Sequence, residues 1–229
     1  MKLVRIVGVL ALLVILVAIW MVVVSTQFGS SPQELPGKFQ GRVLAMEFVG
    51  YTSDIDKILG PDVSHNRDVM RKIILIDFLW IACYGLLFVA ISVLLARRNC
   101  PWARYLGRLA LVAGLAAAAF DIRENIAILN ALNCFPCDQA LVNRINDAAL
   151  LKWTMSFVAI ALLAIAFQDL NNRWAHWIWI SFIFTAGLGF LGLWKHTVLG
   201  LIAIPLLIGL ALLAITAFFR PQNLREHVV

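Results

Sequence analysis

The residues of this sequence that could do chemistry are polar side chains placed inside long apolar segments. The segment AAAAFDIRENIAIL, residues 116–129, contains Asp121, Glu124 and Asn125 within a stretch otherwise typical of a membrane-spanning helix. At about 100° per residue these three side chains share one face of a helix, whereas Arg123 points nearly the opposite way. Carboxylates on such a face could bind a cation, relay protons or hold the polar head of a ligand.

Two further apolar segments contribute polar residues at a similar depth. Asp77 and Tyr84 are seven residues apart, which places them on one helix face, and Lys152 shares its face with alanine and serine residues. At ~1.5 Å per residue, Asp77 and Lys152 lie ~6–8 Å inside the ends of their segments, and Glu124 and Asp121 lie ~9–14 Å inside. We therefore expect one polar cluster, formed by Asp77, Tyr84, Asp121, Glu124, Asn125 and Lys152.

Two interpretations of this cluster remain open. In the first, it is a structural network of ion pairs and hydrogen bonds that fixes the helices in register. In the second, it is a polar cavity that binds a ligand, because three acids against Lys152 leave surplus negative charge unless Arg123 or Arg71 turns inward or one acid is protonated. A charge at the centre of a membrane helix costs ~2.5–3.5 kcal/mol, so these groups must face one another or water.

The composition places the chain in a membrane. Of its 229 residues, 62% are hydrophobic and only 14% are charged, which leaves more apolar surface than a soluble domain could bury. Segments of about 20 apolar residues are long enough to cross a bilayer. The predicted fold class is therefore all-α, a polytopic bundle of about six transmembrane helices in a single membrane domain, residues 1–229. The predicted spans are residues 6–25, 73–95, 106–130, 148–167, 175–194 and 197–219.

Basic residues gather on one side of this predicted bundle. Nine of them fall on the same side if there are six spans, and the positive-inside rule makes that side cytoplasmic. Both termini are then cytoplasmic, in what we interpret as a bacterial inner membrane. This distribution explains the formal charge of +6, so no nucleic-acid partner is expected. The nine residues are Lys2, Arg5, Arg97, Arg98, Arg104, Arg108, Arg173, Arg220 and Arg225.

The first apolar segment is predicted to stay in the membrane, and a long loop follows it. Residues 6–24 form a longer apolar run than the core of a cleaved signal peptide, so we expect a retained anchor. Residues 26–71 are predicted to be an extracytoplasmic loop with two short amphipathic helices, the second with Ser53 as its N-cap and Gly60 at its end. We expect these helices to rest on the membrane surface or to fold over the mouth of the bundle.

Cysteine and histidine residues offer a second kind of chemistry. Cys134 and Cys137 form a C-x-x-C pair that would face an oxidising compartment, where we expect either a local structural disulfide or free thiols. A thiol oxidoreductase is an alternative, although the first loop lacks the second cysteine pair that such an enzyme needs. The four histidines are scattered and no nucleotide-binding or hydrolase motif occurs, so no metal and no cofactor is expected.

Four pieces of the sequence together resemble a family of small bacterial integral membrane proteins. The pieces are MEFVGYTSDIDKILG, IILIDFLWIACYGLLF, AAFDIRENIAIL and AALLKWTMSFVAIALL. The family has a short amphipathic segment, an LDFLF-like span followed by a tyrosine, a D-x-x-E-N span and an A-x-x-L-K span. The resemblance covers residues 46–163, with Trp80 as a departure from the LDFLF-like piece. It implies that the six cluster residues occupy the motif positions, and it implies no activity, since none is established for the family.

These observations favour a non-enzymatic membrane protein whose cluster binds or passes a small cation, a proton or a lipid-like ligand. Its expected partners are the lipid bilayer and such a ligand, and the sequence identifies no protein partner. One alternative is a structural or assembly subunit whose tryptophan-rich fifth span meets another protein. The less favoured alternative is a thiol-disulfide oxidoreductase that uses Cys134 and Cys137.

Overall fold

The computed structural model describes residues 2–29, 35–39, 41–97, 100–134, 137–168 and 172–224. These residues are almost entirely helical and include no strand, which confirms the predicted all-α class. Arg98 and Arg225, two of the basic residues used to predict the orientation, lie outside this part of the chain. Six long helices are apolar enough to cross a membrane, so the chain is a multi-pass membrane protein. These spans are α1 (Lys2–Ser25), α4 (Val63–Ala96), α5 (Pro101–Asn133), α6 (Gln139–Gln168), α7 (Arg173–Trp194) and η2 (His196–Leu201) continued by α8 (Ala203–Phe219).

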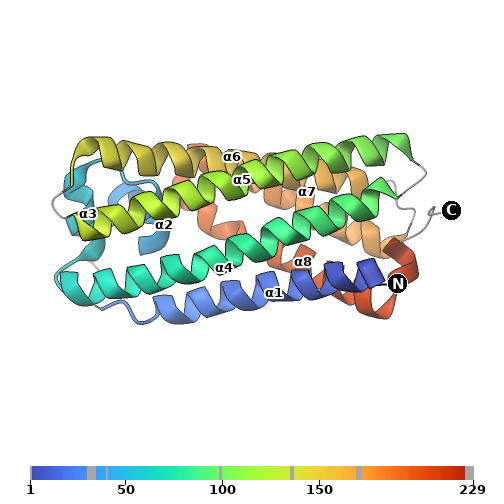
Figure 1. Cartoon of the computed structure of the whole chain (residues 1–229), viewed down its shortest axis with the longest axis horizontal. Coiled ribbons are helices and arrows are strands. Elements are labelled where there is room, and N and C mark those ends of the chain that lie inside the picture. Colours follow the sequence, from blue (N-terminus) through green and yellow to red (C-terminus); the bar gives the residue numbers. More distant parts are fainter. Residues whose placement is uncertain are drawn as a thin grey trace.

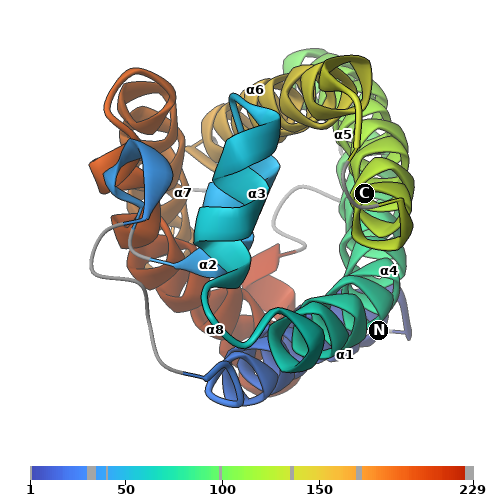
Figure 2. The same ribbon diagram turned by 90° about the vertical axis from the view of Figure 1, so that its left-hand side faces the viewer.

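The six spans form a ring in the order of the sequence. Each span packs against the next one, and α8 closes the ring by packing against α1. The spans run along the long axis of the molecule, and α1 begins at the end where α8 finishes (Figure 1). At the opposite end, α2 (Arg42–Glu47) and α3 (Thr52–Leu59) lie across the ring (Figure 2). We call α2 and α3 the cap, the end of the bundle that they cover the capped end, and the opposite end the terminal end.

Small residues allow two pairs of neighbouring spans to approach closely. The ring of Phe88 on α4 lies against Gly114 of α5, and the ring of Phe157 on α6 lies against Gly189 of α7. A Cβ atom at either glycine would collide with the facing ring. These contacts follow the usual pattern of membrane helices, whose interfaces are rich in small residues because lipid provides no hydrophobic driving force between helices.

Helix α4 begins earlier than the predicted span. The carboxylate of Asp62 accepts a hydrogen bond from the backbone N–H of His65 at 3.3 Å and caps the first turn. Residues 63–71, predicted as loop, are therefore helical, and their polar character hides this from hydropathy. With 34 residues, α4 is ~51 Å long at ~1.5 Å per residue, well beyond the ~30 Å of a bilayer core. Its first turns extend past the membrane and support the cap.

The cap folds over the mouth of the ring rather than resting beside it. Met46 of α2 and Ile55 and Ile58 of α3 are fully buried, in one apolar cluster with Ile128 of α5 and Ile145 of α6. This packing decides between the two expected positions of the loop helices. Short helices of this length are marginal alone, so the burial of their apolar faces stabilises them.

The start of α3 differs from the sequence-based expectation. Its N-cap is Tyr51, not Ser53, because the carboxylate of Asp54 accepts a hydrogen bond from the Tyr51 backbone N–H at 3.2 Å. Ser53 is consequently the second residue of the helix. The end of α3 is as predicted, since Gly60 has a φ of 70° and stops the helix there.

The side chain of Asn66 ties the cap to two spans, and its loss should loosen the cap. Its amide donates to the Leu59 carbonyl at 2.6 Å, and its oxygen accepts from the Gly29 N–H at 2.9 Å. Asn66 is fully buried, so Asn66→Ala leaves the buried Leu59 carbonyl and the half-buried Gly29 N–H unpaired. We expect a loss of ~2 kcal/mol in the free energy of unfolding and faster hydrogen exchange over residues 42–59. The exposed neighbour Ser64 provides the control: Ser64→Ala should change stability by less than ~0.5 kcal/mol.

Candidate functional site

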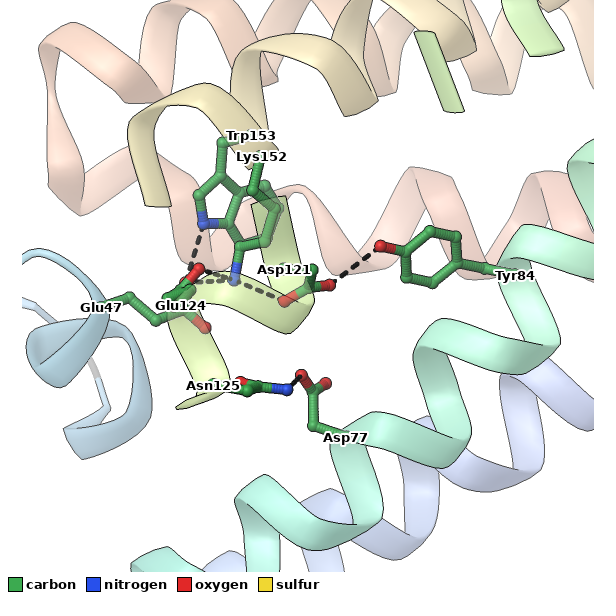
Figure 3. Close-up of polar contacts among 8 residues, drawn as sticks. All are labelled: Glu47, Asp77, Tyr84, Asp121, Glu124, Asn125, Lys152 and Trp153. Atoms are coloured by element: carbon green, nitrogen blue, oxygen red, sulfur yellow. Dashed lines mark hydrogen bonds and ion pairs between the residues drawn. The ribbon is translucent and has the colours of Figure 1, made fainter. Parts of the chain in front are cut away.

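A layer of polar side chains crosses the inside of the ring just below the cap. Three spans and one cap helix supply it, and each side chain points toward the others (Figure 3). We call this group the charged layer. Its members are Glu47 on α2, Asp77 and Tyr84 on α4, Asp121, Glu124 and Asn125 on α5, and Lys152 and Trp153 on α6.

Lys152 is the centre of the charged layer. Its Nζ lies 2.7 Å from Glu124 Oε2, 3.2 Å from Asp121 Oδ1 and 3.2 Å from Glu47 Oε2. All four side chains are buried, and Glu124 is fully inaccessible. The ammonium therefore joins α6 to α5 and to the cap at once. Removing charges from water is costly, and this arrangement is stable only because opposite charges meet at contact distance.

Hydrogen bonds extend the charged layer away from the lysine in two directions. The hydroxyl of Tyr84 donates to Asp121 Oδ2 at 3.0 Å, which attaches α4 to α5. On the other side, the indole N–H of Trp153 donates to Glu47 Oε2 at 2.8 Å, which holds the cap carboxylate in place. Trp153 also lies beside the ammonium of Lys152, 5.3 Å from ring centroid to Nζ.

A second contact between α4 and α5 lies in the same layer. The amide of Asn125 donates to Asp77 Oδ2 at 2.7 Å. Both side chains are at least nine-tenths buried. Asp77 is thus bound by a neutral amide, whereas the other three carboxylates contact the lysine.

A cavity of about 650 Å³ opens from the charged layer toward the middle of the ring. Its wall near the cap is polar and includes Arg42, Glu47, Asp77, Tyr84, Asp121, Lys152 and Ser156. The remainder of its wall is apolar, with contributions from five spans: Val14, Leu87, Ile91, Ile160, Leu163, Phe182 and Leu210 are among them. From Asp77 to Ile91 the cavity follows α4 for ~20 Å at ~1.5 Å per residue. A polar end and a long apolar wall are thus parts of one space.

The structure brings together all six residues that the sequence analysis assigned to the cluster. They contact one another in two groups, the first around Lys152 and the second formed by Asp77 and Asn125. The two arginines considered as partners do not take part. Arg123 is exposed, as its position on the helix indicated, and Arg71 contacts Asp68 at 3.3 Å and Asn133 at 2.7 Å on the outside of the capped end.

Two members of the charged layer were missed in the sequence. Glu47 lies in a short loop helix, and no spacing in the sequence relates it to Lys152. Trp153 follows Lys152 directly and belongs to the neighbouring face of α6, so a helical wheel gives no reason to select it. The one available signal was an acidic residue inside the apolar segment RVLAMEFVG, which a short amphipathic helix would bury or shield.

The cysteine pair and His196 lie apart from the charged layer. All four cysteines are free thiols, and Cys134 and Cys137 follow the end of α5 at the capped end. Burial raises the pKa of the Cys137 thiol above its ordinary value. The ring of His196 stacks on Phe39 at 4.7 Å and lies 5.2 Å from the ring of Phe48, so it packs the cap against η2.

No family model, curated protein or solved structure matches this chain. The resemblance based on the LDFLF-like, D-x-x-E-N and A-x-x-L-K motifs stays a prediction. We therefore interpret the site from its own geometry.

Substitution of Lys152 tests how much stability the charged layer holds. Lys152→Met keeps most of the apolar stem of the side chain but leaves three buried carboxylates without their shared cation. We expect a loss of ~3–5 kcal/mol in the free energy of unfolding, measured by denaturant titration in micelles. Arg123→Met on the exposed face of α5 is the matched control and should change stability by less than ~0.5 kcal/mol. Equal stability of Lys152→Met and wild type would contradict a central role for the lysine.

Proposed function

We propose that this protein binds a lipid-like, amphipathic ligand in its central cavity. The head of the ligand lies at the charged layer, and its chain lies along the apolar wall. The observation that supports this function is the cavity of about 650 Å³, which combines a charged end with a long apolar wall. Ligand pockets of this size are typically apolar with a few placed polar groups, which fits an amphipathic molecule.

The geometry gives less support to a passage for cations. The Nζ of Lys152 lies among three carboxylates at 2.7–3.2 Å, where a bound cation would otherwise sit. Below the charged layer the wall continues with Leu87, Ile91 and Leu210. A hydrated ion needs oxygen ligands along its path, which these side chains do not provide. We therefore favour ligand binding over conduction, and a non-enzymatic role.

The orientation of the molecule is part of the proposal. We propose that both termini are cytoplasmic and that the cap faces the outside of a bacterial inner membrane. In support of this, the described basic residues used in the sequence analysis lie where α1, α4, α5, α7 and α8 reach the terminal end of the bundle. Positive charge marks the cytoplasmic side of membrane proteins. The cavity would then open in the outer half of the bilayer.

Two alternatives receive less support from the structure. The exposed tryptophans of α7, such as Trp177 and Trp194, suit a protein partner but equally suit the membrane interface. For a thiol oxidoreductase, a reactive cysteine needs a lowered pKa, whereas burial raises the pKa of Cys137. Neither alternative uses the cavity.

Filling the cavity should abolish ligand binding without unfolding the bundle. Ser156 lies on the polar part of the wall, one turn beyond Lys152, so Ser156→Phe places a ring where the ligand head would lie. We expect photolabelling by a diazirine derivative of dodecanol, in lipid nanodiscs, to fall about tenfold, which corresponds to ~1.4 kcal/mol. Leu150→Phe, on the lipid-facing side of the same helix, should label like the wild type. Equal labelling of both variants and the wild type would refute the proposed site.

Alkylation of Cys137 tests the thiol oxidoreductase. Because burial raises its pKa, little thiolate is present at neutral pH, and iodoacetamide should react slowly. The rate should increase with pH. The pH at which it is half-maximal should be higher for the native protein than for the same cysteine in the denatured chain. Peptide mass spectrometry after timed alkylation measures both rates. A native Cys137 that reacts faster than the denatured one would favour the redox alternative.

A further inference from the structure

We infer that the ligand head is an amine with a neighbouring oxygen atom, and that Asp77 and Trp80 of α4 recognise it. This inference rests on the proposed function, because it assigns the chemistry of the ligand in the same cavity. Its basis is a difference between the polar side chains of the wall. Glu47 and Asp121 contact the Lys152 ammonium, whereas Asp77 contacts no cation among the described residues and the indole N–H of Trp80 has no hydrogen-bond partner there.

The ammonium of Lys152 is already surrounded by carboxylates of the protein. Three of them lie within 3.2 Å of Nζ, so its charge is compensated without a ligand. The partners of the lysine are also engaged, since Asp121 accepts from Tyr84 and Glu47 accepts from Trp153. These side chains hold the bundle and its cap together. They are structural members of the cavity wall rather than groups that would receive a ligand head.

Asp77 is the carboxylate of the charged layer that contacts no cation among the described residues. Its side chain is buried, with an exposed fraction of 8%, and it lines the cavity. Its Oδ2 accepts from Asn125, and among the described residues its Oδ1 has no hydrogen-bond partner. A carboxylate has about four lone-pair sites, so one hydrogen bond leaves it well short of satisfied. A donor from the ligand would complete it.

Trp80 provides a donor one turn further along α4. It also lines the cavity, and its indole Nε1 is buried and has no hydrogen-bond partner in the described structure. Its ring packs edge-on against Tyr84, with 4.9 Å between centroids, which fixes its orientation. Residues three apart share a helix face, so Trp80 and Asp77 reach the cavity from the same side of α4. An oxygen atom of the ligand would accept from it.

The charge of the layer selects an amine as the donor on the ligand. The carboxylates of Glu47, Asp77 and Asp121 line the cavity, and that of Glu124 lies against Lys152. Among the described residues, Lys152 and Arg42 are the cations that line the cavity. Together these formal charges leave two negative charges in excess. A protonated amine at Asp77 would reduce this excess, whereas a fatty-acid carboxylate would increase it. The apolar wall accommodates the attached chain, so the ligand class is a long-chain amino alcohol or a similar amphipathic amine.

Competition between probes of equal chain length tests this assignment on the wild-type protein. Each probe competes with the photoreactive dodecanol in nanodiscs, at the same mole fraction in the lipid. We expect N-dodecylethanolamine to compete best, followed by dodecylamine, dodecanol and dodecanoate, with about tenfold between dodecylamine and dodecanol. If dodecanol labels the cavity and the amines compete no better than dodecanol, the head-group assignment is wrong and the proposed function stands. If no probe enters the cavity, the proposed function itself fails.

Two variants assign the recognition to the named side chains. Asp77→Asn should remove the preference for dodecylamine over dodecanol, and Trp80→Phe should remove the advantage of N-dodecylethanolamine over dodecylamine. The controls are Asp68→Asn on the exposed part of α4 and Trp102→Phe at the exposed start of α5. Both controls should retain the wild-type order of probes. An unchanged order in Asp77→Asn would overturn the role of Asp77.

Discussion

The contact between the Lys152 ammonium and three carboxylates is the interaction on which the arrangement of this bundle depends. It joins α6, α5 and the cap at a single atom, because its partners come from α5 and from α2. An ion pair buried in a membrane protein has no competing water, so a missing partner leaves an uncompensated charge. Small residues let the helices approach, but they do not fix which turn of α5 faces which turn of α6. The lysine fixes that register.

The closed ring and the charged layer together explain why a cavity exists. None of the described spans passes through the middle of the ring, so side chains of the surrounding spans occupy the space inside. Near the terminal end, large apolar residues such as Phe167 and Leu213 are buried in one apolar cluster. Near the cap, the polar side chains are drawn toward Lys152 and toward α5, and the space between them and α8 stays open. The ion pairs therefore determine the shape of the cavity as well as its charge.

The sequence predicted the spans and six of the eight members of the charged layer for a clear physical reason. Hydropathy and helical periodicity are local properties, so six spans and the inward faces of α4, α5 and α6 can be read from neighbouring residues. The role of Glu47 depends on a long-range contact between a loop helix and a span. No local pattern encodes such a contact. The early start of α4 was missed because its first turns are polar, and hydropathy identifies only the apolar part of a span.

The side chains that join the helices also orient the two side chains proposed to recognise the ligand. Asn125 holds the carboxylate of Asp77, and Tyr84, itself bonded to Asp121, packs against the ring of Trp80. Both recognition groups are thus oriented by side chains that the charged layer has already fixed. A ligand that meets them orders few additional side chains, so less of its interaction energy is spent on conformational entropy. The network that joins the helices and the pair proposed to recognise the ligand are two parts of one layer, so a ligand would meet side chains that are already in place.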